Sequence, residues 1–182
     1  MILGVIGGSG LYEIEGLTDV EEVPVQTPFG APSASLIRGT LEGTTLLFLP
    51  RHGRGHHILP GELHHRANVF ALKSLGAEAI VSLSAVGSLR EELRPGDMVL
   101  VDQFVDRTRN AADHTFFGGG IVAHVSLAHP TCEVLRAFLH RTMTEMLALA
   151  NPGDIRVHVG GTYINMQGPA FSTLAESNLY RS

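Results

Sequence analysis

The chain has 182 residues, of which 44% are hydrophobic and 17% are charged, a balance typical of a globular domain with a sizeable core. The net charge of -5 argues against a broad nucleic-acid surface, because neutralising many phosphates along a polymer requires a basic field. Only Lys73 among the 13 basic residues is a lysine, so arginine must do any anion binding. One cysteine excludes an intrachain disulfide, and we find neither a charged-then-apolar leader nor an apolar run long enough to span a bilayer. We therefore expect one domain in a reducing, cytoplasmic compartment.

The first part of the chain predicts three strands. Residues 2–6 form a short apolar run closed by glycines, which indicates a buried strand in the centre of a sheet. Residues 33–38 and 44–49 are two further strand-like runs. Gly39 and Gly43 bracket a short turn between these runs, so we expect the two strands to pair antiparallel.

Helices and strands alternate through the rest of the chain. Apolar residues recur at three and four positions over 62–75, after Pro60 and Gly61, and this period predicts an amphipathic helix. The strand, helix, strand order favours parallel pairing. The predicted fold class is therefore α/β, with a mixed, largely parallel twisted central sheet flanked by helices. The other predicted elements are strands at 79–83, 98–101 and 156–165, and helices at 130–149 and from residue 174 onward.

A glycine-rich turn, Gly7-Gly8-Ser9-Gly10, follows the first predicted strand. Such a turn brings backbone N–H groups close to an anion, and Ser9 adds a hydroxyl donor. It lacks the third glycine of the dinucleotide fingerprint, because Glu13 stands there, and the Gly-Lys-Ser/Thr ending of the nucleotide phosphate loop. The turn therefore predicts a site for an anion other than a bound nucleotide, and a plain tight turn is the alternative.

Two further groups of polar residues follow predicted strands, where open α/β sheets bind ligands. Arg51-His52 follows the strand at 44–49 and offers an arginine fork and an imidazole donor, a pair that suits a phosphate dianion. Ser84-Ala85 follows the strand at 79–83 and offers a hydroxyl and free backbone amides. The alternatives are a surface arginine beside a packed histidine, and an ordinary exit from a strand.

Three other features have a structural and a functional interpretation. The histidines at 52, 56, 57, 64 and 65 suggest a metal cluster, but glycines and prolines interrupt any helical ligand spacing, so we expect no metal. Cys132 stands near a helix start and is expected to be packed rather than nucleophilic. Phe171 follows Gly168-Pro169 and offers a face that could stack on a planar base, with a core position as the alternative.

Taken together, several stretches resemble the 5'-methylthioadenosine phosphorylases, within the trimeric purine nucleoside phosphorylases, over essentially the whole chain. These stretches are Gly7 to Leu11, Thr27-Pro28-Phe29-Gly30, Arg51-His52-Gly53, Ser84 to Arg90, Asp102-Gln103-Phe104 and Gln167 to Ser177. The resemblance implies phosphorolysis of 5'-methylthioadenosine to adenine and 5-methylthioribose 1-phosphate, as part of purine and methionine salvage. Inorganic phosphate is then the co-substrate, and no metal or organic cofactor is expected.

The resemblance also implies site residues, position by position. Ser9, Arg51, His52, Ser84 and the Ala85 N–H match phosphate-binding positions. Val86, Gly87 and Phe171 match the base pocket, and Ser172 matches a position associated with the choice of purine. His124 matches a histidine supplied across the subunit interface, which implies a homotrimer. The expected partners are a purine nucleoside and phosphate, with neither nucleic acid nor a membrane.

Some features of the family lie outside this pattern. The ribose-contacting methionine, a further phosphate-binding threonine and the leaving-group aspartates match nothing in the chain, so we expect residues 1–182 to be a single phosphorylase domain that lacks its C-terminal part. Gln167, Leu174 and His64-His65 stand where relatives commonly carry Glu, Arg and Asn-Tyr. The alternatives are therefore phosphorolysis of another purine nucleoside, such as methylthioinosine or inosine, a catalytically impaired module that binds nucleoside or phosphate, and a histidine-metal hydrolase.

Overall fold

The computed structural model of the chain describes residues 1–8, 14–108, 114–150 and 155–181. It divides into two compact units, Met1–Val86 with Asn110–Gly120, and Gly87–Arg109 with Ile121–Ser182. The first unit contains β1 (Ile2–Gly7), β2 (Thr18–Val23), β3 (Leu36–Leu41), β4 (Thr44–Pro50), the 3-10 turn η1 (Pro60–Glu62), α1 (His65–Ser74) and β5 (Ala79–Ser82). The second contains β6 (Met98–Leu100), β7 (Gln103–Asp106), α2 (Glu133–Ala150), β8 (Val157–Val159), β9 (Thr162–Asn165) and α3 (Leu174–Arg181).

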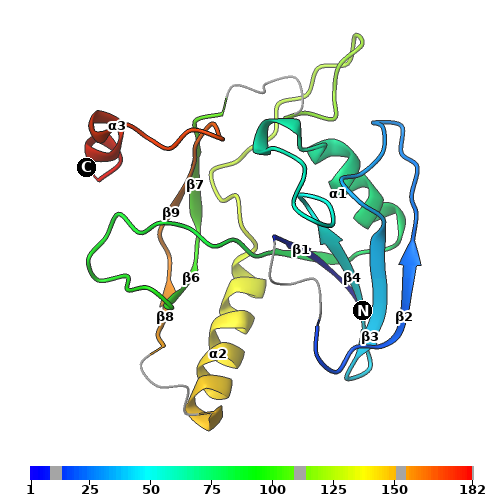
Figure 1. The fold of residues 1–182 in the computed structure, drawn as a ribbon, viewed down its shortest axis with the longest axis horizontal. Coiled ribbons are helices and arrows are strands. Elements are labelled where there is room, and N and C mark those ends of the chain that lie inside the picture. The colour runs from blue at the N-terminus through cyan, green and yellow to red at the C-terminus, as the bar shows by residue number, and fades with distance from the viewer. Residues whose placement is uncertain (9–13, 109–113, 151–154, 182) are drawn as a thin grey trace. The chain divides into compact units, whose positions relative to one another are not determined.

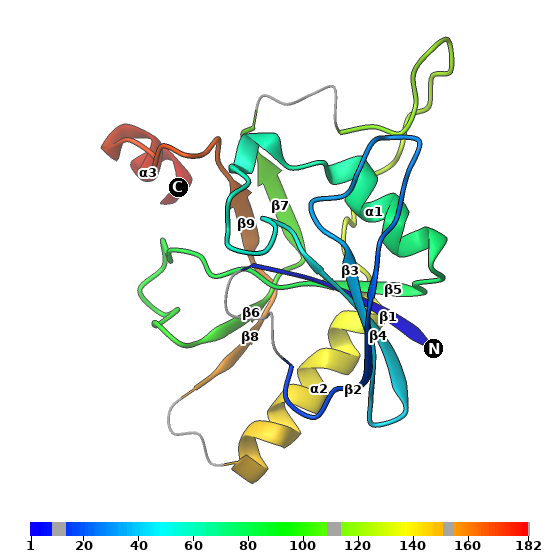
Figure 2. The ribbon, with the colours of Figure 1, turned by 45° about the vertical axis from the view of Figure 1, so that its right-hand side comes forward.

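A five-stranded sheet forms the first unit, in the order β2-β3-β4-β1-β5 (Figures 1 and 2). β1 pairs in parallel with both β4 and β5, whereas β3 pairs antiparallel with β2 and β4. The predicted mixed α/β sheet and the interior position of β1 are therefore confirmed. Residues of β3, β4 and α1 pack together as the core, because the apolar face of the helix is buried against the sheet. The buried core residues are Leu36, Leu47, Leu49, Ala71, Leu72 and Ala77.

The antiparallel pairing of β3 with β4 is confirmed, but the predicted bounds of β3 and of the turn were wrong. The turn is the pair Glu42 and Gly43, both with positive φ (45° and 77°), which suits the twist of a two-residue hairpin. Gly39 lies inside β3, opposite Leu46. A Cβ at Gly39 would come within 2.6 Å of the Leu17 Cγ, so this glycine serves close packing rather than a turn.

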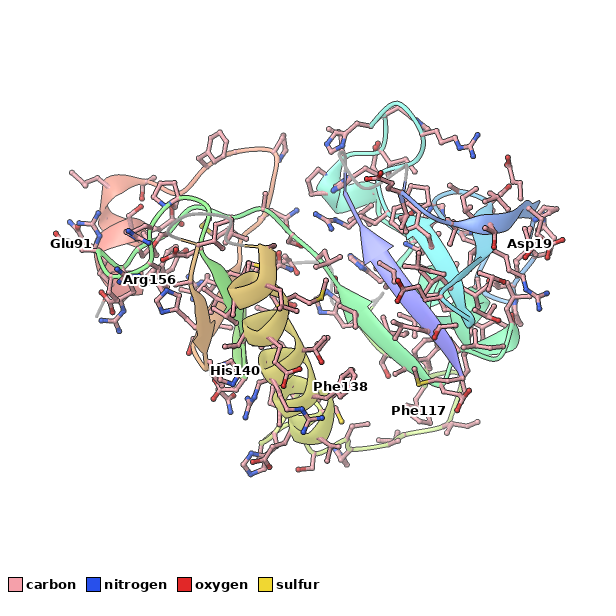
Figure 3. All side chains as sticks on the ribbon, turned by 90° about the horizontal axis from the view of Figure 1, so that it is seen from below. Asp19, Glu91, Phe117, Phe138, His140 and Arg156 are labelled. Atoms are coloured by element: carbon pink, nitrogen blue, oxygen red, sulfur yellow. The ribbon has the colours of Figure 1, made fainter. Side chains whose placement is uncertain are left out.

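Two parallel strand pairs, β6 with β8 and β7 with β9, organise the second unit. The single strand predicted for residues 156–165 is interrupted between β8 and β9 by Gly160 and Gly161, whose φ angles are 86° and 126°. α2 is connected to the β6–β7 junction by the ion pair between Arg136 Nη1 and Asp102 Oδ2, at 3.5 Å. Phe138 projects from α2 in Figure 3 and is 51% exposed. In the described part of the chain, no helix has the length and apolar character needed to cross a bilayer.

Candidate anion-binding site

Three neighbouring parallel strands of the first unit, β4, β1 and β5, end at the same edge of the sheet. Gly8 follows β1, Arg51 follows β4, and Ser84 comes two residues after β5. Backbone hydrogen bonds continue past the strands, from Arg51 N–H to Gly7 C=O (3.1 Å) and from Leu83 N–H to Ile6 C=O (2.9 Å). The structure thus brings together three chain segments that the sequence predicted to bind an anion, at the edge where open α/β sheets bind ligands.

Arg51 spans this edge. Its Nη1 donates to the Leu83 carbonyl at 2.9 Å, and its Nε donates to His52 Nε2 at 3.2 Å. A Cβ built on Gly8 would lie 3.3 Å from Arg51 Nη2, so the glycine makes room for the guanidinium. A guanidinium has about five N–H donors, and the described residues use those two. The remaining donors form a fork that can bind a tetrahedral anion. The Leu83 carbonyl was missed at the sequence level, because no residue pattern identifies a backbone acceptor.

His52 is buried, with 7% of its surface exposed. Its Nδ1 lies 2.9 Å from the Ile58 carbonyl, and its own carbonyl accepts from the Ile58 N–H at 3.1 Å. Two hydrogen bonds therefore join His52 to Ile58. Burial lowers the pKa of His52 below its ordinary value. The hydrogen bond to Ile58 raises this pKa, and the charges of Arg51 and His56 lower it. The ring of His52 is thus packed and contacts Arg51, and its predicted role in binding phosphate stays a prediction.

The end of β5 contributes groups that are open to a ligand. Ser84, Ala85 and Val86 are exposed. Within the described ranges, neither the Ser84 hydroxyl nor the Ala85 N–H has a hydrogen-bond partner. A free hydroxyl and a free backbone N–H beside an arginine fork are suitable donors for phosphate oxygens. The predicted contributions of Ser9 and Gly10 lie outside the described residues.

The remaining predicted site residues, Gly87, His124, Phe171 and Ser172, belong to the second unit. Phe171 is 95% exposed, so the core alternative for this ring was wrong. Ser172 precedes α3, and its Oγ lies 2.8 Å from the Oγ of Ser177, which is in that helix. Gly87 and His124 are both exposed. An exposed aromatic ring is available for stacking, and an exposed imidazole is available to a ligand or a second chain.

The histidines of residues 52–65 have varied surroundings. The rings of His52 and His56 are in contact, with centroids 4.4 Å apart and their planes tilted by 31°. His57 Nδ1 lies 2.9 Å from the Arg54 carbonyl, and His64 Nδ1 lies 2.7 Å from the Ala31 carbonyl. Among the residues that the structure describes, no three His, Cys, Asp or Glu side chains gather as a metal site would need. Hydrogen bonds to the backbone therefore account for His57 and His64.

The mixed sheet with helices beside it places the chain in the class of α/β proteins, and the site at its edge is a candidate for anion binding. Residues 2–182 match the sequence pattern that defines the Phosphorylase superfamily, so the chain belongs to this family. It is 56% identical over 181 residues to a protein of Geobacter sulfurreducens named S-methyl-5'-thioadenosine phosphorylase, and 54% identical to one of the same name from Synechocystis. The chain spans 61% of the length of the first and 54% of the second.

Solved structures agree with this family. A methylthioadenosine phosphorylase from an antarctic soil metagenomic library has a TM-score of 0.89 and 46% identity, over 98% of this chain and 61% of that one. A methylthioadenosine phosphorylase from Schistosoma mansoni, solved in complex with adenine, has a TM-score of 0.86 and 37% identity, over 98% of this chain and 69% of that one. The resemblance to methylthioadenosine phosphorylases expected from the sequence is thereby confirmed.

Proposed function

We propose that the protein catalyses phosphorolysis of 5'-methylthioadenosine, giving adenine and 5-methylthioribose 1-phosphate. The observation that carries this proposal is the Arg51 fork between Gly8 and the end of β5, next to the open Ser84 hydroxyl and Ala85 N–H. Relatives named for this reaction, at 56% identity, support the substrate. Ser9, Arg51, His52, Ser84 and Ala85 would form the phosphate site, with Arg51 as its charged member.

The proposed chemistry follows from where the charge develops. An oxygen of inorganic phosphate forms a bond to the anomeric carbon, and the bond from that carbon to the purine nitrogen breaks as the purine leaves with the electron pair. The proton that the phosphate loses balances the one that the purine takes up to become neutral adenine. The sugar becomes oxocarbenium-like in between, so an anion held against one face stabilises it. Fixed donors such as the Arg51 fork hold that anion without reorganising solvent. The chemistry requires neither a metal nor an organic cofactor.

The rest of the proposed site would recognise the nucleoside. Val86, Gly87 and Phe171 would line the base pocket, and Ser172 would take part in choosing the purine. We propose that His124 reaches a neighbouring subunit of a cytoplasmic homotrimer. The supporting observation is that the residues around His124 are apolar and exposed, a composition suited to contact with another chain. These exposed residues are Ile121, Val122, Val125 and Leu127.

The test is release of adenine from 5'-methylthioadenosine by the protein expressed from its complete coding region, with and without inorganic phosphate. We expect release only with phosphate, accompanied by 5-methylthioribose 1-phosphate, and no loss of activity after treatment with a chelator. Release that ignores phosphate would contradict phosphorolysis, and activity that a chelator abolishes would support a metal hydrolase instead. Light scattering of the same protein tests the trimer.

A substrate panel separates the alternatives. One Schistosoma mansoni relative is named adenosine/methylthioadenosine phosphorylase, so adenosine belongs in the panel with methylthioinosine and inosine. We expect the largest kcat/KM for 5'-methylthioadenosine. A preference for inosine would contradict the proposed substrate while keeping the reaction class. Binding of nucleoside without turnover would support a binding module.

A further inference from the structure

We propose that Ser177, in α3, is a positioning residue that fixes the direction of the Ser172 hydroxyl, so that the two serines together decide which purine is preferred. This inference rests on the proposed function, in which Ser172 takes part in choosing the purine. It adds a second residue to that choice, since the sequence assigned no role to Ser177. The observation that carries it is the distance of 2.8 Å between the two Oγ atoms.

The two hydroxyl groups belong to half-buried side chains in a segment that is otherwise open to solvent. Ser172 is half-buried between two exposed neighbours, Phe171 and Thr173, and Ser177 is likewise half-buried after the exposed Glu176. Neither hydroxyl makes a second hydrogen bond within the part of the chain that the structure describes. Each serine is therefore the partner of the other, and partial shielding from water strengthens the bond between them.

Other hydrogen bonds fix the backbone around this pair. Thr173 caps α3, because its Oγ1 accepts from the Glu176 N–H at 3.2 Å while its own N–H donates to the Glu176 Oε2 at 2.7 Å. The Ser177 N–H donates to the Thr173 carbonyl at 2.9 Å. None of these three bonds uses a serine hydroxyl. A change confined to the Ser177 side chain should therefore leave the helix and the Ser172 backbone in place.

A serine hydroxyl by itself is a poor group for choosing between purines. It has one O–H donor and two lone pairs, and it rotates to suit its partner. Adenine carries an amino donor where a 6-oxopurine such as hypoxanthine carries a carbonyl acceptor, and a freely rotating hydroxyl can pair with either. The bond to Ser177 removes this freedom, because it commits either the proton or a lone pair of Ser172. The groups that remain on Ser172 then point in set directions, which favours one purine over the other.

The first experiment measures kcat/KM for 5'-methylthioadenosine and for methylthioinosine in Ser177→Ala, made in the protein expressed from its complete coding region. Alanine is a better helix former than serine, so α3 should be retained. We expect the ratio of the two kcat/KM values to fall by about three- to tenfold, and Ser177→Thr, which keeps a hydroxyl, to restore most of it. Asn178→Ala, at an exposed position in the same helix, is the control and should keep the ratio. A loss of activity on both substrates that leaves their ratio unchanged would overturn the proposal.

The second experiment tests whether Ser177 acts through Ser172. If it does, Ser177→Ala should have no further effect on the ratio in a protein that already carries Ser172→Ala, whereas independent, additive changes would contradict the proposal. If the unmodified protein does not release adenine from 5'-methylthioadenosine, the proposed function is wrong. Calorimetry then compares the affinities of the same variants for adenine and hypoxanthine, and we expect the ratio of affinities to fall in Ser177→Ala. An unchanged ratio, or no binding of either base by the unmodified protein, would overturn the inference as well.

Discussion

Arg51 Nη1 donates to the Leu83 carbonyl at 2.9 Å and so connects the ends of two strands, β4 and β5, that are not neighbours in the sheet. β1 lies between them, and the guanidinium passes over its end at Gly8. One side chain therefore connects three strand ends. An arginine fixed at two points loses little freedom when it binds an anion, which favours binding.

Gly8→Ala tests the passage of Arg51 over β1. The new Cβ would lie 3.3 Å from Arg51 Nη2, so the flexible guanidinium must move while the fold is little disturbed. We expect affinity for inorganic phosphate to fall by about tenfold, with an unchanged unfolding midpoint. Gly4→Ala is the contrasting variant, because its Cβ would lie 3.3 Å from the Cδ2 of Leu72, a fully buried core residue, and should cost about 1–3 kcal/mol of unfolding free energy. A loss of stability in Gly8→Ala as large as that in Gly4→Ala would contradict this prediction.

Ser84→Ala tests the hydroxyl at the end of β5. The variant loses one donor to a charged ligand, so calorimetry should show affinity for inorganic phosphate reduced by about tenfold. Ser88→Ala is the matched control in the same loop, since the Ser88 Oγ donates to the Arg90 carbonyl at 2.7 Å and belongs to no proposed site. An equal effect of both substitutions would show that the loop, rather than the Ser84 hydroxyl, determines affinity.

Asn68→Ala tests a buried polar pair in the first unit. Asn68 is 4% exposed, accepts from the Ser33 N–H at 2.7 Å and donates to the Ser33 Oγ at 2.9 Å. Its removal leaves buried groups without partners, so urea unfolding should show a loss of about 1–3 kcal/mol. Lys73→Ala, on the exposed side of the same helix, should change stability by less than about 0.5 kcal/mol. Similar values for the two variants would rule out the importance of this pair.

The Asp97 carboxylate should make the stability of the second unit depend on pH in the acid range. Its carboxylate, 2% exposed, accepts from the His158 ring at 3.0 Å and from the backbone N–H groups of Arg94 and Arg156. The His158 hydrogen bond, with the other donors, holds the pKa of Asp97 well below its usual range. Because that pKa is lower in the folded chain, the stabilisation is present above the unfolded value of about 3.9 and is lost as the pH falls below it.

We therefore expect Asp97→Asn to lower the unfolding temperature at neutral pH, with the difference from the unmodified chain persisting to about pH 4 and shrinking below it. Thermal unfolding followed by circular dichroism at a series of pH values measures this difference. Glu91→Gln, at an exposed position (Figure 3), is the control and should show no such trend. A difference that grows as the pH falls below 4 would contradict the assigned role of Asp97.

The sequence predicted the strands and helices that have a strong hydrophobic pattern and missed two strands that lack one. The apolar runs of β1 and β4 and the helical period of α1 identified their elements, although the helix begins at His65 rather than at residue 62. β2 was missed because its sequence, Thr-Asp-Val-Glu-Glu-Val, is polar and exposed at the edge of the sheet. β7 was also missed, and its residues are all exposed. Pairing with a neighbouring strand, rather than burial, creates these two strands.

By itself, the sequence determined the family of the chain and the residues that end its strands, because glycines, an arginine and a serine directly after apolar runs are local signals. Only the tertiary structure decided that β1 lies between β4 and β5, since the partner of a parallel strand depends on distant packing. The tertiary structure also decided the hydrogen-bond partners of the adjacent Arg51 and His52. Their partners are the backbone carbonyls of Leu83 and Ile58, and every residue has such a carbonyl, so geometry alone selects which one is used.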